Sequence, residues 1–220
     1  MLVKHIAVAF LIFLSGCVAY YIPMAVDIPL IEEAGDEKID VGFSSFGFAH
    51  GTYSYGLTDK IAVQAFGNID IFTRFHVQGA VGLYKWYDES LAGIELYGGY
   101  GFGSCIFKRS DIYNKPDYNR TGHYHLVFSQ FNIGKVEMNT ANIDLGLGLK
   151  GGYLIGNFVD RSDFKTMYKD EGVIIEPSVM FRFEGRREVK YSIKFNYVFP
   201  VTIDKRSLLH PFNISLGRQF

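Results

Sequence analysis

The sequence predicts an all-β fold: an antiparallel, up-and-down transmembrane β-barrel of about ten strands, within a range of about eight to twelve. Three observations lead to this prediction. Apolar and polar residues alternate along many segments, the connections between these segments alternate between short and long, and the chain ends on Phe220. The alternation is clearest in "NIDLGLGLKGGY" (142–153), where aliphatic residues occupy one face and Asp144, Lys150 and glycines the other.

The first residues have the pattern of a secretory signal. Lys4 and His5 precede an apolar run from Ile6 to Leu14, which is too short to span a bilayer as a stable helix. The following Ser15-Gly16-Cys17 completes a sequence that resembles the lipobox of bacterial lipoproteins, in which the Cys is acylated. An ordinary signal peptide with an incidental Cys is the alternative. We expect a signal peptide at 1–16 and lipidation, with acyl chains such as palmitate, at Cys17.

The rest of the chain divides into a lipidated N-terminal tether at 17–37 and the barrel at 38–220. The tether is expected to be extended, because it contains two Pro and an acidic cluster. No stretch beyond the signal has a convincing helical period. Ten extended segments are predicted at 38–48, 50–57, 60–68, 79–87, 91–102, 122–133, around 142–153, and at 173–184, 188–199 and 208–220.

The connections between these segments suggest an orientation. Very short turns follow the second, fourth and eighth segments, whereas 103–121 and 154–172 are expected to be long connections. Outer-membrane barrels have short periplasmic turns and longer extracellular loops. The short first connection near Ala49 does not fit this alternation. An even strand number places both barrel ends on the periplasmic side, which is compatible with a lipid at Cys17 in the inner leaflet of the outer membrane.

The alternation alone does not decide whether lipid or water surrounds the barrel. Several segments have the roughly 9–11 residues that a tilted strand needs to cross the hydrocarbon, and many apolar rows end in aromatic residues. These features favour apolar rows that face lipid. The polar side chains predicted to face the lumen are Glu95, Asp144, Lys150, Glu176, Arg182, Glu184, Lys190 and Lys194. The alternative is a periplasm-facing, lipocalin-like lipoprotein whose apolar rows line a cavity for an apolar ligand.

Three motifs have residue types that occur at sites of chemistry. Gly146–Gly151 matches G-x-G-x-x-G but lies within an alternating strand and opens no helix. His123 and His125 lack the further ligands of a metal site. Ser129 and His125 share a strand face about 13 Å apart, which is too far for a nucleophile and its base. The sequence therefore predicts no catalytic, cofactor-binding or metal-binding residue and no enzyme, with a lipid-modifying enzyme as the less favoured alternative.

Composition and the last strand bear on partners. The formal net charge of −1 argues against nucleic-acid binding. The alternating segment that ends in Phe220 resembles the C-terminal signal read by the barrel-insertion machinery, although Arg218 departs from the pattern. Outer-membrane lipid and this machinery are thus the expected partners, and the sequence assigns no surface partner.

One stretch resembles a known group of proteins. "YYIPMAVDIPLIEEAGDEKIDVGFS" and "YGLTDKIAVQAFGNI", within 20–67, are similar to uncharacterised bacterial outer-membrane lipoproteins with a porin-like β-barrel domain. The resemblance implies a location and a fold but no reaction or substrate. The expectation is a bacterial outer-membrane barrel, lipid-anchored at Cys17, with a structural, surface-interaction or narrow-pore role.

Overall fold

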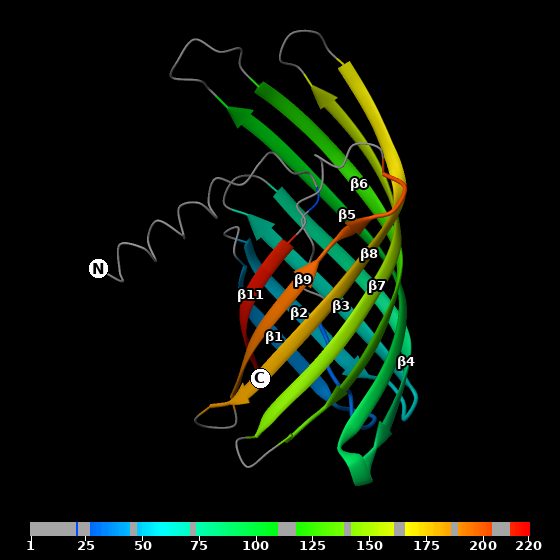
Figure 1. The fold of residues 1–220 in the computed structure, drawn as a ribbon, viewed down its shortest axis with the longest axis vertical. Coiled ribbons are helices and arrows are strands. Elements are labelled where there is room, and N and C mark those ends of the chain that lie inside the picture. The colour runs from blue at the N-terminus through cyan, green and yellow to red at the C-terminus, as the bar shows by residue number, and fades with distance from the viewer. Residues whose placement is uncertain are drawn as a thin grey trace, which may run out of the picture.

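The structure is a computed structural model that describes residues 21, 27–44, 48–70, 74–109, 118–138, 142–160, 166–185, 189–203 and 212–220. These residues form a closed barrel of ten antiparallel strands (Figure 1). The strands are β1 (Glu37–Ser44), β2 (Phe48–Gly56), β3 (Ile61–Asp70), β4 (Arg74–Tyr87), β5 (Ala92–Arg109), β6 (Tyr118–Lys135), β7 (Ile143–Asp160), β8 (Thr166–Glu184), β9 (Lys190–Tyr197) and β11 (Phe212–Gln219). The two-residue β10 (Phe199–Pro200) continues β9 along β8.

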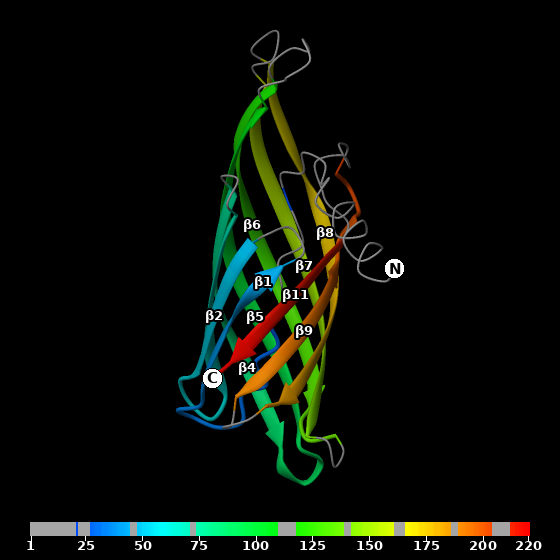
Figure 2. The same cartoon turned by 90° about the vertical axis from the view of Figure 1, so that its left-hand side faces the viewer.

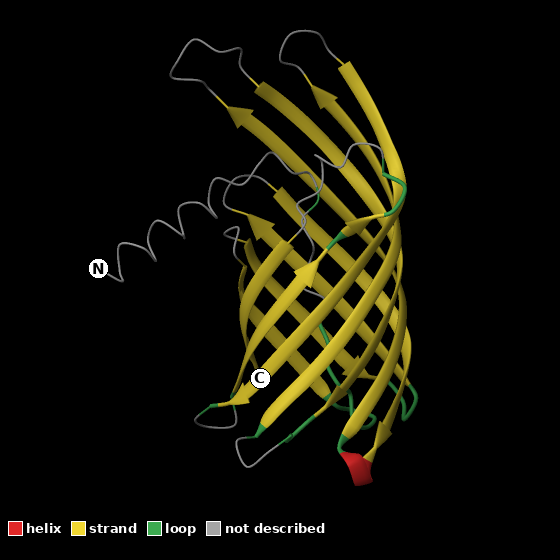
Figure 3. Ribbon diagram, in the orientation of Figure 1, coloured by secondary structure: helices red, strands yellow, loops and turns green. Residues whose placement is uncertain are grey.

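The strands follow one another around the barrel in an almost strict up-and-down order. From β1 to β9 each strand pairs with the next, apart from the short β10, and β11 closes the sheet between β9 and β1. The prediction of an all-β, antiparallel barrel of about ten strands is confirmed. Among the described residues the helical content is a single 3₁₀ turn, η1 (Asp88–Ser90), and no helix is long and apolar enough to cross a bilayer (Figure 3).

The two ends of the barrel are named here by their connections. The turn end contains residues 57–60, η1 and the C-terminal Phe220, whose amide donates to the carbonyl of Ile39 at the start of β1. The loop end is the opposite end, where β1 stops at Ser44 and β5 at Arg109. The start of β1 and the end of β11 lie together at the turn end, as an even number of strands requires (Figure 2).

The strands have very different lengths. β5, β6, β7 and β8 have 18 or 19 residues each, whereas β1, β9 and β11 have eight. The four long strands therefore rise beyond the rest at the loop end (Figure 1). The expected extents of the long connections at 103–121 and 154–172 are wrong, because strands continue to residue 109, begin again at 118, and leave only 161–165 between β7 and β8. The alternation fails near 103–106 because the barrel interior is apolar there too, at Cys105 and Tyr124.

Polar and apolar side chains are divided between the two surfaces of the barrel. Along β7, Leu147, Leu149 and Tyr153 are 43–49% exposed on the outside, while Asp144 and Lys150 are 1% exposed inside. The same division runs around the barrel. The exposed outer side chains include Val41 on β1, Val81 on β4, Leu96 on β5, Phe131 on β6, Ile175 on β8, Phe195 on β9 and Leu216 on β11. The outside is thus largely apolar, and much of the inside is polar.

Candidate functional site

The barrel interior is occupied by the chain's own N-terminal segment. Asp27, Ile28, Leu30 and Ile31 are each at most 1% exposed, and their contacts are with inward-facing side chains of the strands. The predicted tether at 17–37 thus has a described part, 27–31, inside the barrel. We call residues 27–31 the inserted segment.

Hydrogen bonds from the barrel wall hold the backbone of the inserted segment. The carbonyl of Asp27 accepts from the side-chain amide of Gln130 at 2.9 Å. The guanidinium of Arg182 donates to the carbonyl of Ile28 at 2.7 Å, and the amide of Ile31 donates to the carboxylate of Glu95 at 2.9 Å. Because the segment has no strand partner of its own, these side chains replace the pairing that its buried backbone needs.

A buried ion triad joins the inserted segment to two strands. The Nζ of Lys194 on β9 lies 2.8 Å from Oδ1 of Asp27 and 2.9 Å from Oδ1 of Asp40 on β1. Asp40 also accepts from the hydroxyl of Ser192 at 2.9 Å, and Nε2 of His50 is 3.4 Å away. All three charged side chains are at most 1% exposed, so the ammonium group of Lys194 compensates the charge of both buried carboxylates.

Further ion pairs fill the lumen on the β7–β8–β9 side. Asp144 lies 3.6 Å from Nη1 of Arg182 and 2.9 Å from Nζ of Lys190, and Lys150 lies 2.5 Å from Glu176. Opposite charges on β7, β8 and β9 thus compensate one another inside the barrel, which limits the cost of burying them.

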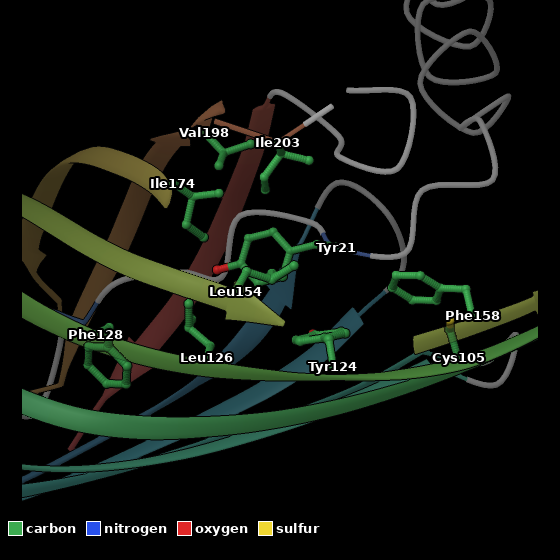
Figure 4. Packing of buried hydrophobic residues seen from close by; sticks show 10 residues of the cluster. All are labelled: Tyr21, Cys105, Tyr124, Leu126, Phe128, Leu154, Phe158, Ile174, Val198 and Ile203. Carbon is green, nitrogen blue, oxygen red and sulfur yellow. The ribbon is translucent and has the colours of Figure 1, made fainter. Parts of the chain in front are cut away.

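Toward the loop end the lumen becomes apolar. Tyr21 is 1% exposed, and its ring meets that of Tyr124 edge to face, with 5.4 Å between centroids. Leu126, Leu154 and Ile203 belong to the same cluster, which Figure 4 shows gathered around Tyr21. This apolar cluster lies on the loop-end side of the polar part of the lumen and packs closely around Tyr21.

Toward the turn end the inserted segment fits against glycines of the wall. A Cβ placed on Gly134 would lie 2.7 Å from Cδ2 of Leu30, and one on Gly146 would lie 2.9 Å from Cγ2 of Ile28. Leu30 itself has φ of +56°, a conformation that costs a bulky residue about 1–3 kcal/mol. Its complete burial against the half-buried Trp86 offsets this strain.

The eight side chains predicted to face the lumen fall into two groups. Glu95, Asp144, Lys150, Glu176, Arg182 and Lys194 are at most 1% exposed inside the barrel. Lys190 and Glu184 lie at the turn end of the lumen, where Lys190 is half-buried beside Asp144, and the exposed Glu184 accepts from the amide of Asn142. Cys17 lies outside the described residues.

The motifs weighed for chemistry lie on strands. Gly146–Gly151 is part of β7, so its glycines form no loop at a helix N-terminus. Ser129 is exposed on the outer face of β6, where its cross-strand neighbours are Gly98 and Gly151. The ring of His125 forms a hydrogen bond with the hydroxyl of Tyr100. Among the described residues, no group of three or more His, Cys, Asp or Glu could hold a metal ion.

Two hollows lie at opposite ends of the described barrel. One of about 450 Å³ at the loop end is bordered by Cys105, His123, Phe158 and Lys169, among others. The other, of about 470 Å³, lies at the turn end beside Glu32, Glu33, Asp36 and Asp88. In the loop-end hollow, the hydroxyl of Ser104 and the thiol of Cys105 both donate to the carbonyl of Gly122.

The sequence predicted only some of the residues that surround the inserted segment. The predicted Glu95, Arg182 and Lys194 do bind this segment. The residues missed are Asp27 itself, the amides Gln64, Gln130 and Asn132 that bind its carbonyl, and Asp40 and His50 beside Lys194. One signal was available, because Asp27 stands within an aliphatic stretch that also holds Ile28, Leu30 and Ile31, a composition more apolar than a solvated tether needs.

Searches of protein-family models, curated proteins and solved structures find no match for this chain.

Proposed function

We propose that this protein is an outer-membrane β-barrel, lipid-anchored at Cys17, whose lumen is closed by the inserted segment and whose role is structural or in surface interaction. The observation that carries the proposal is the apolar outer surface around a charged, self-compensated interior. A soluble lipocalin-like barrel needs the reverse arrangement, with polar residues outside and an apolar cavity inside.

The height of the apolar surface agrees with a bilayer. On β8 the outward residues from Val173 to Phe183 are apolar, and Glu171 and Lys169 follow toward the loop end. Ten residue steps cover about 33 Å along a strand. At a tilt of about 40°, this corresponds to a band about 25 Å tall, the height of the lipid-facing band of known outer-membrane barrels.

The charged side chains on the outer face lie near the edges of this band. Lys85 and Arg218 point outward close to the turn end, where each lies over an aromatic ring, that of Tyr87 at 4.7 Å and that of Phe220 at 4.5 Å. Basic and aromatic side chains of this kind suit the headgroup region. Arg218, which departs from the terminal pattern, is thus compatible with a membrane boundary.

The interior favours a closed barrel over an open pore. The inserted segment, the ion pairs and the apolar cluster at Tyr21 occupy the lumen at successive levels. The long strands support a surface role, because β8 continues from Val173 to Thr166, about 23 Å along the strand beyond the band. We propose that this projecting wall, β5–β8, presents its outer face to surface partners.

The first experiment compares the wild type with Cys17→Ala in membranes of the producing bacterium. We expect the variant to resist extraction by salt and alkali, to need detergent for release, and to keep heat-dependent migration on gels. Release as a soluble protein would contradict the membrane barrel and favour the tethered soluble alternative.

A second experiment tests what surrounds the outer face. Leu149 lies near the middle of the band on β7 and is 49% exposed. In lipid, Leu149→Arg should cost about 2–4 kcal/mol of folding free energy. The matched variant Lys169→Leu, beyond the band, should change stability by less than about 1 kcal/mol. An unchanged folding midpoint of Leu149→Arg in vesicles would argue for water around this face.

A further inference from the structure

The described N-terminal residues, 21 and 27–35, lie at successive levels of the lumen. At the turn end, the amide of Gly35 donates to the carbonyl of Gly56, at 2.8 Å, close to the turn at 57–60. The inserted segment then passes the middle of the lumen, where Asp27 meets Lys194. Tyr21 lies in the apolar cluster with Ile174 and Ile203, at the level where β10 pairs with β8 (Figure 4). Read backward from β1, the chain therefore runs from the turn end toward the loop end.

Covalent geometry limits where Cys17 can lie. Cys17 is four residue steps from Tyr21, and a fully extended chain of four steps spans at most about 14 Å. The apolar band is about 25 Å tall, so an acyl chain at the turn-end leaflet is out of reach while Tyr21 keeps its place. A path back through the lumen is also blocked by the inserted segment.

We propose that the chain threads its own barrel, so that acylated Cys17 enters the leaflet at the loop end. This rests on the proposed membrane barrel with its short turns in the periplasm. The lipid then lies on the cell-surface side, in the outer leaflet. This proposed placement differs from the inner-leaflet lipid that is compatible with the sequence-based orientation. Tyr21 and its cluster close the lumen below the anchor.

The orientation is tested by labelling single cysteines in whole cells with a membrane-impermeant maleimide. All variants carry Cys105→Ala, and acylated Cys17 has no free thiol. Ala19→Cys, between the anchor and Tyr21, should react equally in intact and permeabilised cells. The matched control Glu89→Cys, in η1 at the turn end, should react only after permeabilisation.

Threading itself is tested by a disulfide that needs no knowledge of orientation. Because Ile28 lies against Gly146, the pair Ile28→Cys and Gly146→Cys should form a disulfide in the oxidising periplasm. The bond is detected by thiol alkylation of the denatured protein before and after reduction. The control pair Ile28→Cys and Gly151→Cys should stay reduced, because Gly151 has open space around it.

The outcomes separate this inference from the proposed function. Heat-dependent migration of every variant reports the folded membrane barrel. If migration is retained but Ala19→Cys reacts only after permeabilisation, or the Ile28–Gly146 disulfide does not form, the threading inference is overturned and the barrel stands. If the protein is soluble without its lipid, the proposed membrane barrel is contradicted, and the threading inference that rests on it is contradicted as well.

Discussion

The ion triad formed by Asp27, Asp40 and Lys194 gives a quantitative prediction about what holds the inserted segment in place. At an effective dielectric constant of about 20, each pair at 2.8–2.9 Å has a Coulomb attraction of about 6 kcal/mol before desolvation. Both carboxylate oxygens lie within 2.9 Å of the same nitrogen, so they are less than about 6 Å apart. Their mutual repulsion is therefore at least about 3 kcal/mol.

The two single substitutions remove different parts of this balance. Lys194→Met abolishes both attractions and leaves two buried carboxylates facing each other, so it should destabilise the barrel by about 3–5 kcal/mol. Asp27→Asn abolishes one attraction together with the repulsion, and Asp40 still compensates Lys194. Its cost should be about 1–2 kcal/mol, similar to one charged hydrogen bond. The double variant should be more stable than Lys194→Met alone, since it leaves one unpaired carboxylate instead of two.

Trp86 provides the assay. It is the only Trp of the chain and packs against the cluster that contains Ile28 and Leu30, so its fluorescence reports the inserted segment. Urea unfolding in detergent micelles, followed by this emission and by heat-dependent migration, gives the free energy of each variant. If Lys194→Met were no more damaging than Asp27→Asn, or if the two costs simply added, the account of the triad as a shared charge balance would be refuted.

Three further predictions follow from the filled lumen. Gly146→Leu should cost about 1–3 kcal/mol of thermal stability, because its side chain meets Ile28, whereas Gly151→Leu on the same strand should be nearly neutral in a thermal melt. In planar bilayers the full chain should show no steady conductance, and deletion of residues 18–31 should produce it; a conducting wild type would contradict a closed lumen. Tyr21→Ala should speed alkylation of the buried Cys105 thiol in the folded protein, since both belong to the apolar cluster; an unchanged rate would show that Tyr21 does not close this end.

The period-two pattern was sufficient for the parts of the barrel where lumen and exterior differ in polarity. Along 142–153, Leu147 faces outward and Asp144 inward, so the polarity of each residue indicates which surface of the barrel it faces. The pattern was insufficient around 103–109, where Cys105 is buried inside and Ile106 exposed outside although both are apolar. There the strands extend further than predicted.

The inserted segment could not have been predicted from alternation, because it is not a strand. Its backbone forms hydrogen bonds with side chains that are distant in sequence. Glu95 is 64 positions from Ile31, and Arg182 is 154 positions from Ile28. Such contacts form only when the closed barrel brings these residues together, so no local sequence pattern indicates them. The sequence predicts that Lys194 faces the lumen but not its partners, which are Asp40 on β1 and Asp27 outside every strand.

The seam between the first and last strands carries a consequence for assembly. β1 and β11 are matched over only five residue pairs, from Asp40–Gln219 to Ser44–Ser215. If the N-terminal chain threads the barrel as proposed, an acylated end is too bulky to pass through the filled lumen of a closed barrel. The inserted segment then has to be in place before β1 pairs with β11. Formation of this seam is the last step of assembly on that pathway, and release of the N-terminal segment requires that the seam reopens.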